Sequence, residues 1–217
     1  FWEGGLIVMG APWFRALRRR YPGAELHFLT LDVNAQICGM TGAADKVIEL
    51  RVSRGLCVFF LDLLRALPGL RTARYDLLLD LEFLSRFSAA LTALIGAGFA
   101  AGYSRTGVWR GRMHDAVAPL DLKAHMEDNY AAVFSAVGVK AGPEDRRPLD
   151  QAAGPHPLEP ARPFIVLNFD RKDIMPERAW PREYYDEVLR RVLAGGRFRV
   201  AAVSQRRVEL PSLPGLA

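Results

Sequence analysis

Lysine, cysteine and histidine are scarce in this 217-residue chain, and long apolar runs are absent. Lysine supplies only Lys46, Lys123, Lys140 and Lys172 of the 29 basic residues, so arginine carries most of the positive charge behind the formal net value of +5. No stretch reaches the ~18 consecutive apolar residues that a bilayer-spanning helix needs. Basic runs interleaved with aromatic residues are also missing, which argues against a nucleic-acid partner. The arginine excess reflects either genome composition or attraction to phosphate-bearing or membrane-surface partners.

The two cysteines and four histidines form no recognisable metal or redox motif. Cys38 and Cys57 lie among apolar residues without metal-ligand spacing, so we interpret both as core thiols in a reducing compartment. Walker, G-x-S-x-G and G-x-G-x-x-G motifs are absent, and the last absence argues against an NAD-dependent Rossmann enzyme. No metal ion is therefore expected from the residues alone.

Short apolar segments alternate with helical patterns along the chain, which is typical of a parallel sheet wrapped by helices. The expected strands are residues 24–30, 46–50, 75–80, 98–103, 164–167 and 198–203. The expected helices are residues 6–20, 32–40, 56–67, 84–94, 124–137 and 181–193. The predicted fold class is therefore α/β, with Rossmann-like parallel sheets.

A proline-rich stretch divides this pattern into two parts. Residues 141–163 contain six prolines, too many for a helix or sheet interior. We predict an N-terminal domain at residues 1–140, a linker at 141–162 and a partial C-terminal domain at 163–217. Phe1-Trp2 resembles the end of a strand, and the pattern stops after residue 210 before a layer is complete. We therefore expect the chain to be a fragment of a longer protein.

The strongest candidate site is the charged loop N-F-D-R-K-D-I-M-P-E-R-A-W-P, which starts at Asn168. It leaves a strand and enters a helix, where open α/β sheets bind ligands. Arg171, Lys172 and Arg178 precede a helix N-terminus, and this combination suits a diphosphate. Asn168 and Asp170 complete this predicted donor-binding set.

A second candidate group follows the predicted strand at residues 75–80. Asp80, Glu82 and Arg86 either cap the next helix and form an ion pair, or line a pocket for a hydroxyl-rich substrate. In the second interpretation, one carboxylate acts as a general base. His125 and Asn129 are a weaker pair, expected at i and i+4 on one helix face.

A third group, Glu3, Gly4 and Gly5, lies at the start of the first predicted helix. The glycines form either a tight turn or a place where backbone N–H groups approach an anion. This signal is weak because the full dinucleotide-binding pattern is absent.

Several segments together resemble glycosyltransferase family 9, the heptosyltransferases of lipopolysaccharide core synthesis. Residues 12–30 are similar to the family's first helix and second strand, and residues 75–89 to its acceptor-side segment. The sequence H-M-E-D-N-Y, from His125, resembles the helix before the interdomain crossing. The sequence R-A-W-P, from Arg178, resembles a motif of the second domain.

The resemblance implies a GT-B architecture with two Rossmann-like domains, the second truncated here. It implies inverting transfer of a heptose from ADP-heptose to an anionic, lipid-linked acceptor, without a cofactor. The enzyme would be cytoplasmic and peripheral at the inner face of the bacterial inner membrane. The proposed base is Glu82, Asp80 or Glu3, in that order. The acceptor side would include Gly4, Gly5, Arg86, His125 and Asn129.

The sequence departs from the family pattern at two places. Counting back from Pro12, the position of the family's proposed catalytic Asp is Leu6. Arg171 and Lys172 replace small residues of the second-domain loop. These departures motivate an alternative function, a non-catalytic relative that binds nucleotide or lipid.

Overall fold

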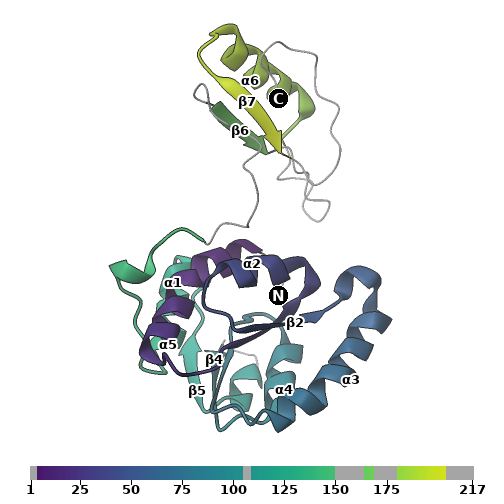
Figure 1. Ribbon diagram of the computed structural model, residues 1–217, viewed down its shortest axis with the longest axis vertical. Coiled ribbons are helices and arrows are strands. Elements are labelled where there is room, and N and C mark those ends of the chain that lie inside the picture. Colours follow the sequence, from purple (N-terminus) through teal and green to yellow (C-terminus); the bar gives the residue numbers. More distant parts are fainter. Residues whose placement is uncertain (1–3, 105–108, 150–163, 169–179, 204–217) are drawn as a thin grey trace. The chain divides into compact units, whose positions relative to one another are not determined.

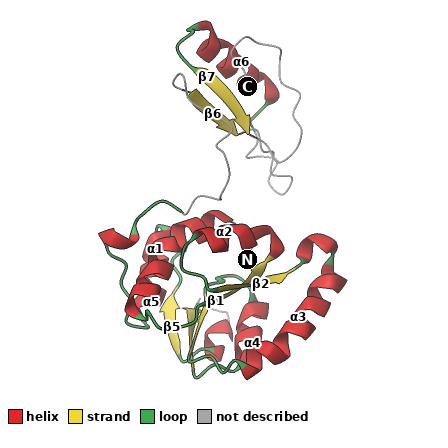
Figure 2. Ribbon diagram, in the orientation of Figure 1, coloured by secondary structure: helices red, strands yellow, loops and turns green. Residues whose placement is uncertain are grey.

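The computed structural model describes residues 4–104, 109–149, 164–168 and 180–203. The chain divides into two compact units, Phe1–Ala152 and Ala153–Ala217. Every paired strand in the described part is parallel, and helices connect the strands (Figures 1 and 2). The predicted α/β class is confirmed. Across the described residues, no helix combines the length and apolar character needed to cross a bilayer.

The first unit contains five α-helices, four short 3-10 helices and five strands among its described elements. The α-helices are α1 (Gly4–Arg20), α2 (Ala35–Met40), α3 (Leu56–Thr72), α4 (Arg86–Ile95) and α5 (Met126–Ser135). The strands are β1 (His27–Leu31), β2 (Lys46–Leu50), β3 (Leu77–Asp80), β4 (Phe99–Ser104) and β5 (Ala116–Pro119). β1 pairs with β2, whereas β3, β4 and β5 form a separate sheet in that order.

Two apolar clusters lie on opposite faces of these strands. Side chains alternate along a strand, so neighbouring residues point to different faces. Phe28 and Leu79 pack with α1 and α5, in a cluster centred on Trp13, Phe14 and Phe134. Leu29 and Leu78 pack on the other side, where α3 and α4 contribute buried leucine and isoleucine side chains. Figure 1 shows α1 beside α5 and α3 beside α4, which agrees with this division.

A buried arginine fastens the end of the first unit to α1. The Arg15 side chain is 6% exposed, and its Nε donates to the Thr41 carbonyl oxygen at 2.7 Å. Its terminal nitrogens donate to the carbonyl oxygens of Arg147 and Pro148 at 2.5 and 2.9 Å. Arg19 binds the Asp145 carboxylate at 2.8 Å. Residues 141–149, predicted as the start of the linker, therefore include backbone held against α1.

The second unit is described by β6 (Phe164–Asn168), α6 (Arg182–Ala194) and β7 (Arg199–Val203). β6 and β7 are paired in parallel, with Ile165 opposite Val200. Leu189 of α6 and Val200 of β7 are fully buried and form the centre of its small core. This is the strand–helix–strand unit that the sequence pattern predicts.

Beyond shifts at the ends of elements and short 3-10 helices, the structure differs from the sequence predictions at three places. β5 was missed because it has only four residues and ends in Pro119. α3 continues to Thr72, beyond the predicted end at residue 67, because Leu70 packs into the core and holds the last turn despite Pro68. The interpretation of both cysteines as core thiols was wrong for Cys57, which is exposed, whereas Cys38 is buried.

Candidate functional site

The carboxyl end of β3 brings the two predicted carboxylates close to one another. Asp80 is the last residue of the strand, and Glu82 lies in the short loop before α4. Ser85 ends this loop as the N-cap of α4, where its hydroxyl accepts hydrogen bonds from the N–H groups of Phe87 and Ser88. The compact loop fixes the backbone near both carboxylates.

Asp80 is at the centre of a buried polar cluster. Its carboxylate lies 2.6 Å from Nη2 of Arg110, and the two side chains are 3% and 1% exposed. The His114 ring nitrogen Nε2 lies 3.1 Å from the same oxygen. Ser88 donates its hydroxyl to this carboxylate, and the N–H of Glu82 donates to the other oxygen. The arrangement stabilises a negative charge in a buried position.

A glycine makes room for the His114 ring in this cluster. Asp80 of β3 is in register with Gly102 of β4, and the ring lies over that position. A Cβ atom on Gly102 would lie 2.6 Å from Nε2 of His114, closer than van der Waals contact allows. The side chain of His114 is fully buried.

The partners of Asp80, which are Arg110, His114 and Ser88, were not predicted from the sequence. An ion pair that involves Arg86 was one of the two interpretations left open there. Arg86 begins α4 and is exposed, whereas Arg110 belongs to the 3-10 helix Trp109–Met113. The partners come from positions 8, 30 and 34 residues along the chain. The only sequence signal was the presence of Gly102 at the opposite position of the neighbouring strand.

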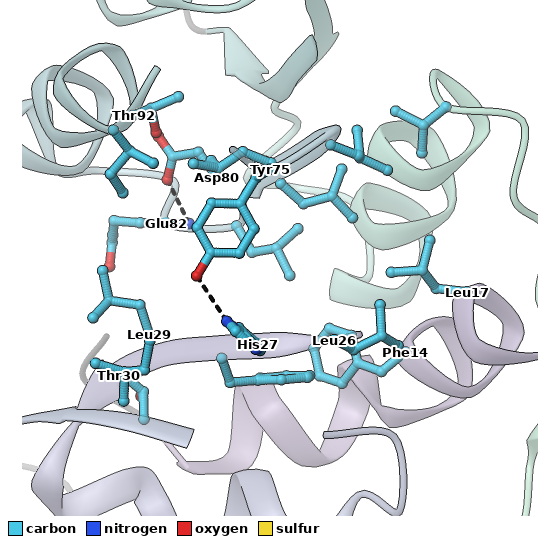
Figure 3. Close-up of a pocket in the computed structure, with 18 of the residues that line it drawn as sticks. Phe14, Leu17, Leu26, His27, Leu29, Thr30, Tyr75, Asp80, Glu82 and Thr92 are labelled. Carbon is cyan, nitrogen blue, oxygen red and sulfur yellow. Dashed lines mark hydrogen bonds between the residues drawn. The ribbon is translucent and has the colours of Figure 1, made fainter. Parts of the chain in front are cut away.

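Glu82 borders a cavity of about 940 Å³ that lies between β1 and β3 (Figure 3). Its carboxylate accepts hydrogen bonds from the N–H groups of Phe83 and Leu84 at 3.1 and 3.2 Å. The facing strands β1 and β3 are not hydrogen-bonded to each other, so their backbones form part of the walls. Most lining side chains are apolar, and the two carboxylates lie where β3 ends.

A histidine and a tyrosine meet where the same two strands begin. Tyr75 precedes β3, and its hydroxyl lies 2.7 Å from Nδ1 of His27, the first residue of β1 (Figure 3). The other ring nitrogen of His27 lies 2.8 Å from a carboxylate oxygen of Glu25. Burial raises the pKa of Tyr75, and the nearby Glu25 charge raises it further. This contact joins β1 to the segment before β3 across the cavity.

The remaining predicted acceptor-side residues do not line this cavity. Gly4 and Gly5 are the first residues of α1, and a Cβ atom on Gly4 would lie 2.4 Å from the Ile37 side chain. His125 precedes α5 as its N-cap instead of sharing a helix face with Asn129, and its Nδ1 accepts from the Glu127 N–H. The acceptor-side role of these residues stays a prediction.

Asn129 has a structural explanation. Its side-chain oxygen accepts from the Asp121 N–H at 2.9 Å, and its side-chain nitrogen donates to the Asp121 carbonyl at 2.9 Å. Both ends of the amide therefore fasten the loop before α5 to that helix. Tyr130, the next residue, donates its hydroxyl to the Leu6 carbonyl, and burial raises the pKa of that hydroxyl.

Of the predicted donor-binding residues, the structure describes only Asn168, the exposed last residue of β6. Asp170, Arg171, Lys172 and Arg178 lie outside the described residues, as does Glu3. Beyond the loop, Pro181 occupies the N-cap position of α6, and the Trp180 ring contacts Tyr185 at a centroid distance of 5.6 Å. Within the described ranges, no three His, Cys, Asp or Glu side chains come together as a metal site.

Comparison with known proteins gives a family match and several related structures. The family model described as glycosyltransferase family 9 (heptosyltransferase) matches residues 63–207, more than half of the chain. No curated protein matches the sequence.

Three solved structures share the fold at low sequence identity. The Escherichia coli heptosyltransferase WaaC with ADP is 16% identical, with a TM-score of 0.70, over 92% of this chain and 64% of that one. The E. coli ADP-heptose lipopolysaccharide heptosyltransferase II is 20% identical, with a TM-score of 0.60, over 90% and 60%. The family 9 glycosyltransferase from Veillonella parvula DSM 2008 is 17% identical, with a TM-score of 0.70, over 92% and 59%.

These matches confirm the GT-B-like fold class, built from Rossmann-like units with parallel sheets. The chain spans about three fifths of the length of the structures it matches.

Proposed function

The chain belongs to glycosyltransferase family 9, and from this premise we propose that it is part of a heptosyltransferase-like enzyme. The donor would be a nucleotide-sugar, ADP-heptose, and the acceptor an anionic, lipid-linked saccharide of the lipopolysaccharide core. The donor assignment is supported by WaaC, which has a related fold and was solved with ADP. The proposed location is the cytoplasm, with peripheral attachment to the inner face of the inner membrane.

In the proposed reaction, an acceptor hydroxyl attacks the anomeric carbon of the donor with inversion. A carboxylate removes the hydroxyl proton as the new bond forms. Arg178 and Lys172 stabilise the charge on the leaving diphosphate. No metal or other cofactor takes part in this scheme.

Glu82 is the preferred base, and the observation that carries this choice is its position. It borders the cavity at the carboxyl end of β3, the end at which α/β sheets bind ligands. Backbone N–H groups hydrogen-bond to its carboxylate and favour the ionised form that a base requires. Asp80 is less suited because Arg110, His114, Ser88 and a backbone N–H already surround its oxygens.

A second candidate function is a non-catalytic relative that binds nucleotide or lipid. It is favoured by Leu6, which occupies the position of the family's proposed catalytic Asp in the resemblance above. Leu6 lines the same cavity, and its side chain has no group that can accept a proton. Glu82 lies in a different loop and would have to replace that missing carboxylate.

Calorimetric titration with ADP tests the donor assignment. We expect Arg178→Ala to weaken ADP binding at least ~10-fold, because a charge-assisted contact contributes about 1.5–3 kcal/mol. Lys172→Ala should also weaken binding. Arg197→Ala, which changes an exposed arginine of the second unit, is the matched control and should bind ADP normally. Equal binding by all four proteins would remove the charged loop from the donor site.

Sugar transfer by the full-length enzyme, of which this chain is proposed to be part, separates the two candidate functions. Glu82→Gln should lower the transfer rate by about 10²–10⁴-fold if this carboxylate is the base. The Asp80→Asn and Glu3→Gln variants test the other two candidates in the same assay. Near-normal rates in all three variants would reject a base among these carboxylates. If the unaltered full-length protein binds ADP but transfers no sugar, the non-catalytic function is established.

A further inference from the structure

Helix α3 exposes a row of large apolar side chains. Leu56, Phe60 and Leu64 follow at intervals of four residues and are 68%, 50% and 64% exposed. Leu61 lies beside them at 48%. The opposite side of the helix is also apolar, with Leu63 and Leu70 buried in the core. A surface helix usually has polar residues on its outer side, so this exposed apolar face requires an explanation.

The apolar face continues onto the beginning of α4. The rings of Phe60 and Phe87 are 6.3 Å apart between centroids and meet edge to face. Phe87, in the first turn of α4, is 39% exposed, and Leu84, in the loop before α4, is 58% exposed. Figure 1 shows the two helices side by side, with α3 at the outer edge of the first unit. We call this set of residues on α3 and at the start of α4 the α3 face.

Positive charge borders the α3 face. Arg54 precedes the helix, Arg65 lies on it and Arg86 stands next to Phe87, and all three are exposed. The only carboxylate within α3 is Asp62, which is buried, pairs with Arg51 at 2.5 Å and lies 4.0 Å from the largely exposed Arg65 side chain. The outer side of the helix therefore combines leucine, phenylalanine and arginine without a negative charge of its own.

We propose that the α3 face docks on an anionic lipid bilayer. Its leucine and phenylalanine side chains would enter the boundary between headgroups and acyl chains, as those of an interfacial helix do. The arginines would contact lipid phosphates from the rim of the face. The proposal deepens the proposed function, on which it rests for a lipid-linked acceptor, by assigning the surface that reaches the membrane.

Charge complementarity favours a bilayer over a protein partner. An exposed apolar helix that has arginines on both sides and no exposed carboxylate of its own matches a surface that is apolar inside and uniformly negative outside. The long arginine side chains can lie along the apolar face while their guanidinium groups stay with the phosphates.

Vesicle co-sedimentation of the 217-residue chain tests this proposal without any donor or acceptor. Binding should be strong on phosphatidylcholine vesicles that contain phosphatidylglycerol and weak on phosphatidylcholine alone. Leu64→Glu should weaken vesicle binding at least ~10-fold, because it replaces an apolar side chain that would enter the bilayer with a charged one. Arg65→Gln should weaken it about 5-fold, the value expected for one basic residue at the surface.

Leu122→Glu and Lys123→Gln are matched controls in the loop before α5. Leu122 is 57% exposed and Lys123 is also exposed, so the same Leu→Glu change and an equivalent loss of one positive charge are made away from α3. Both controls should bind vesicles like the unaltered chain. Circular dichroism shows whether each variant is folded. If Leu64→Glu does not fold, vesicle binding by Arg65→Gln tests the proposal in its place.

Equal vesicle binding by the α3 variants and the controls would overturn the proposal, as would no binding to anionic vesicles. A dimer that forms in solution and is lost in Leu64→Glu, without vesicle binding, would instead assign the α3 face to a second copy. ADP titration of Leu64→Glu keeps the two proposals separate. If Leu64→Glu binds ADP normally but no longer binds vesicles, the docking surface is supported. If the unaltered chain binds vesicles but not ADP, only the proposed function is contradicted.

Discussion

Removing the Arg110 guanidinium should strongly destabilise the first unit. In Arg110→Met, the aliphatic part of the side chain is retained, but Asp80 loses a partner at 2.6 Å in a place where both side chains are almost fully buried. Removing one member of a buried ion pair costs about 3–5 kcal/mol. His114 and Ser88 stay within hydrogen-bonding distance of the carboxylate, so we expect the lower end, about 3 kcal/mol. This is a large share of the 5–15 kcal/mol typical of a folded domain.

Urea denaturation followed by far-UV circular dichroism measures this loss. Arg112→Met is the matched control, because Arg112 belongs to the same 3-10 helix and is exposed. It should change the free energy of unfolding by less than about 0.5 kcal/mol. The double variant Asp80→Asn with Arg110→Met should be more stable than Arg110→Met alone, since no unpaired charge remains. A loss below about 1 kcal/mol in Arg110→Met would refute the argument that this pair is a buried structural element.

Three further predictions follow from buried or paired groups. Asp62→Asn should make the free energy of unfolding less sensitive to acid. The hydrogen bond from Arg51 lowers the pKa of Asp62 from 3.8 to about 2 in the folded state. The ionised Asp62 therefore stabilises the fold above pH 3.8, and this stabilisation is lost as the pH falls to about 2. Urea midpoints over that pH range check this, and an unchanged pH profile would contradict it. Gly102→Ala should lower the thermal midpoint, because the new Cβ atom collides with His114; an unchanged midpoint would mean that the ring moves freely. Arg15→Met should cost about 2–4 kcal/mol in urea denaturation by leaving backbone carbonyls without their donor, whereas Arg20→Met, at an exposed site on the same helix, should cost little.

The sequence pattern predicted most helices and strands because their signals are local. Alternating apolar residues and turn residues lie within each segment, so β2 was expected at residues 46–50 and is found there. Basic residues at the end of α1 and the following Pro22-Gly23 correctly placed its last residue at Arg20. Predictions failed where tertiary contacts overrode a local signal, as in the last turn of α3.

The candidate site was only partly visible in the sequence. Asp80 and Glu82 could be selected because a strand end in an α/β protein is a common place for functional groups. Their different environments could not be inferred, because the partners of Asp80 come from α4 and from the segment after β4. The sequence therefore identified two carboxylates, and the fold separated a buried, paired one from one that borders the cavity.

The sequence by itself determined the α/β class and the family, because apolar periodicity and the order of motifs depend only on the order of residues along the chain. It also contained the leucines, phenylalanines and arginines of α3, but it could not say which of them are covered. Only the tertiary structure decided that Leu63 packs in the core while Leu64 is exposed, since burial depends on which elements pack against each side of a helix.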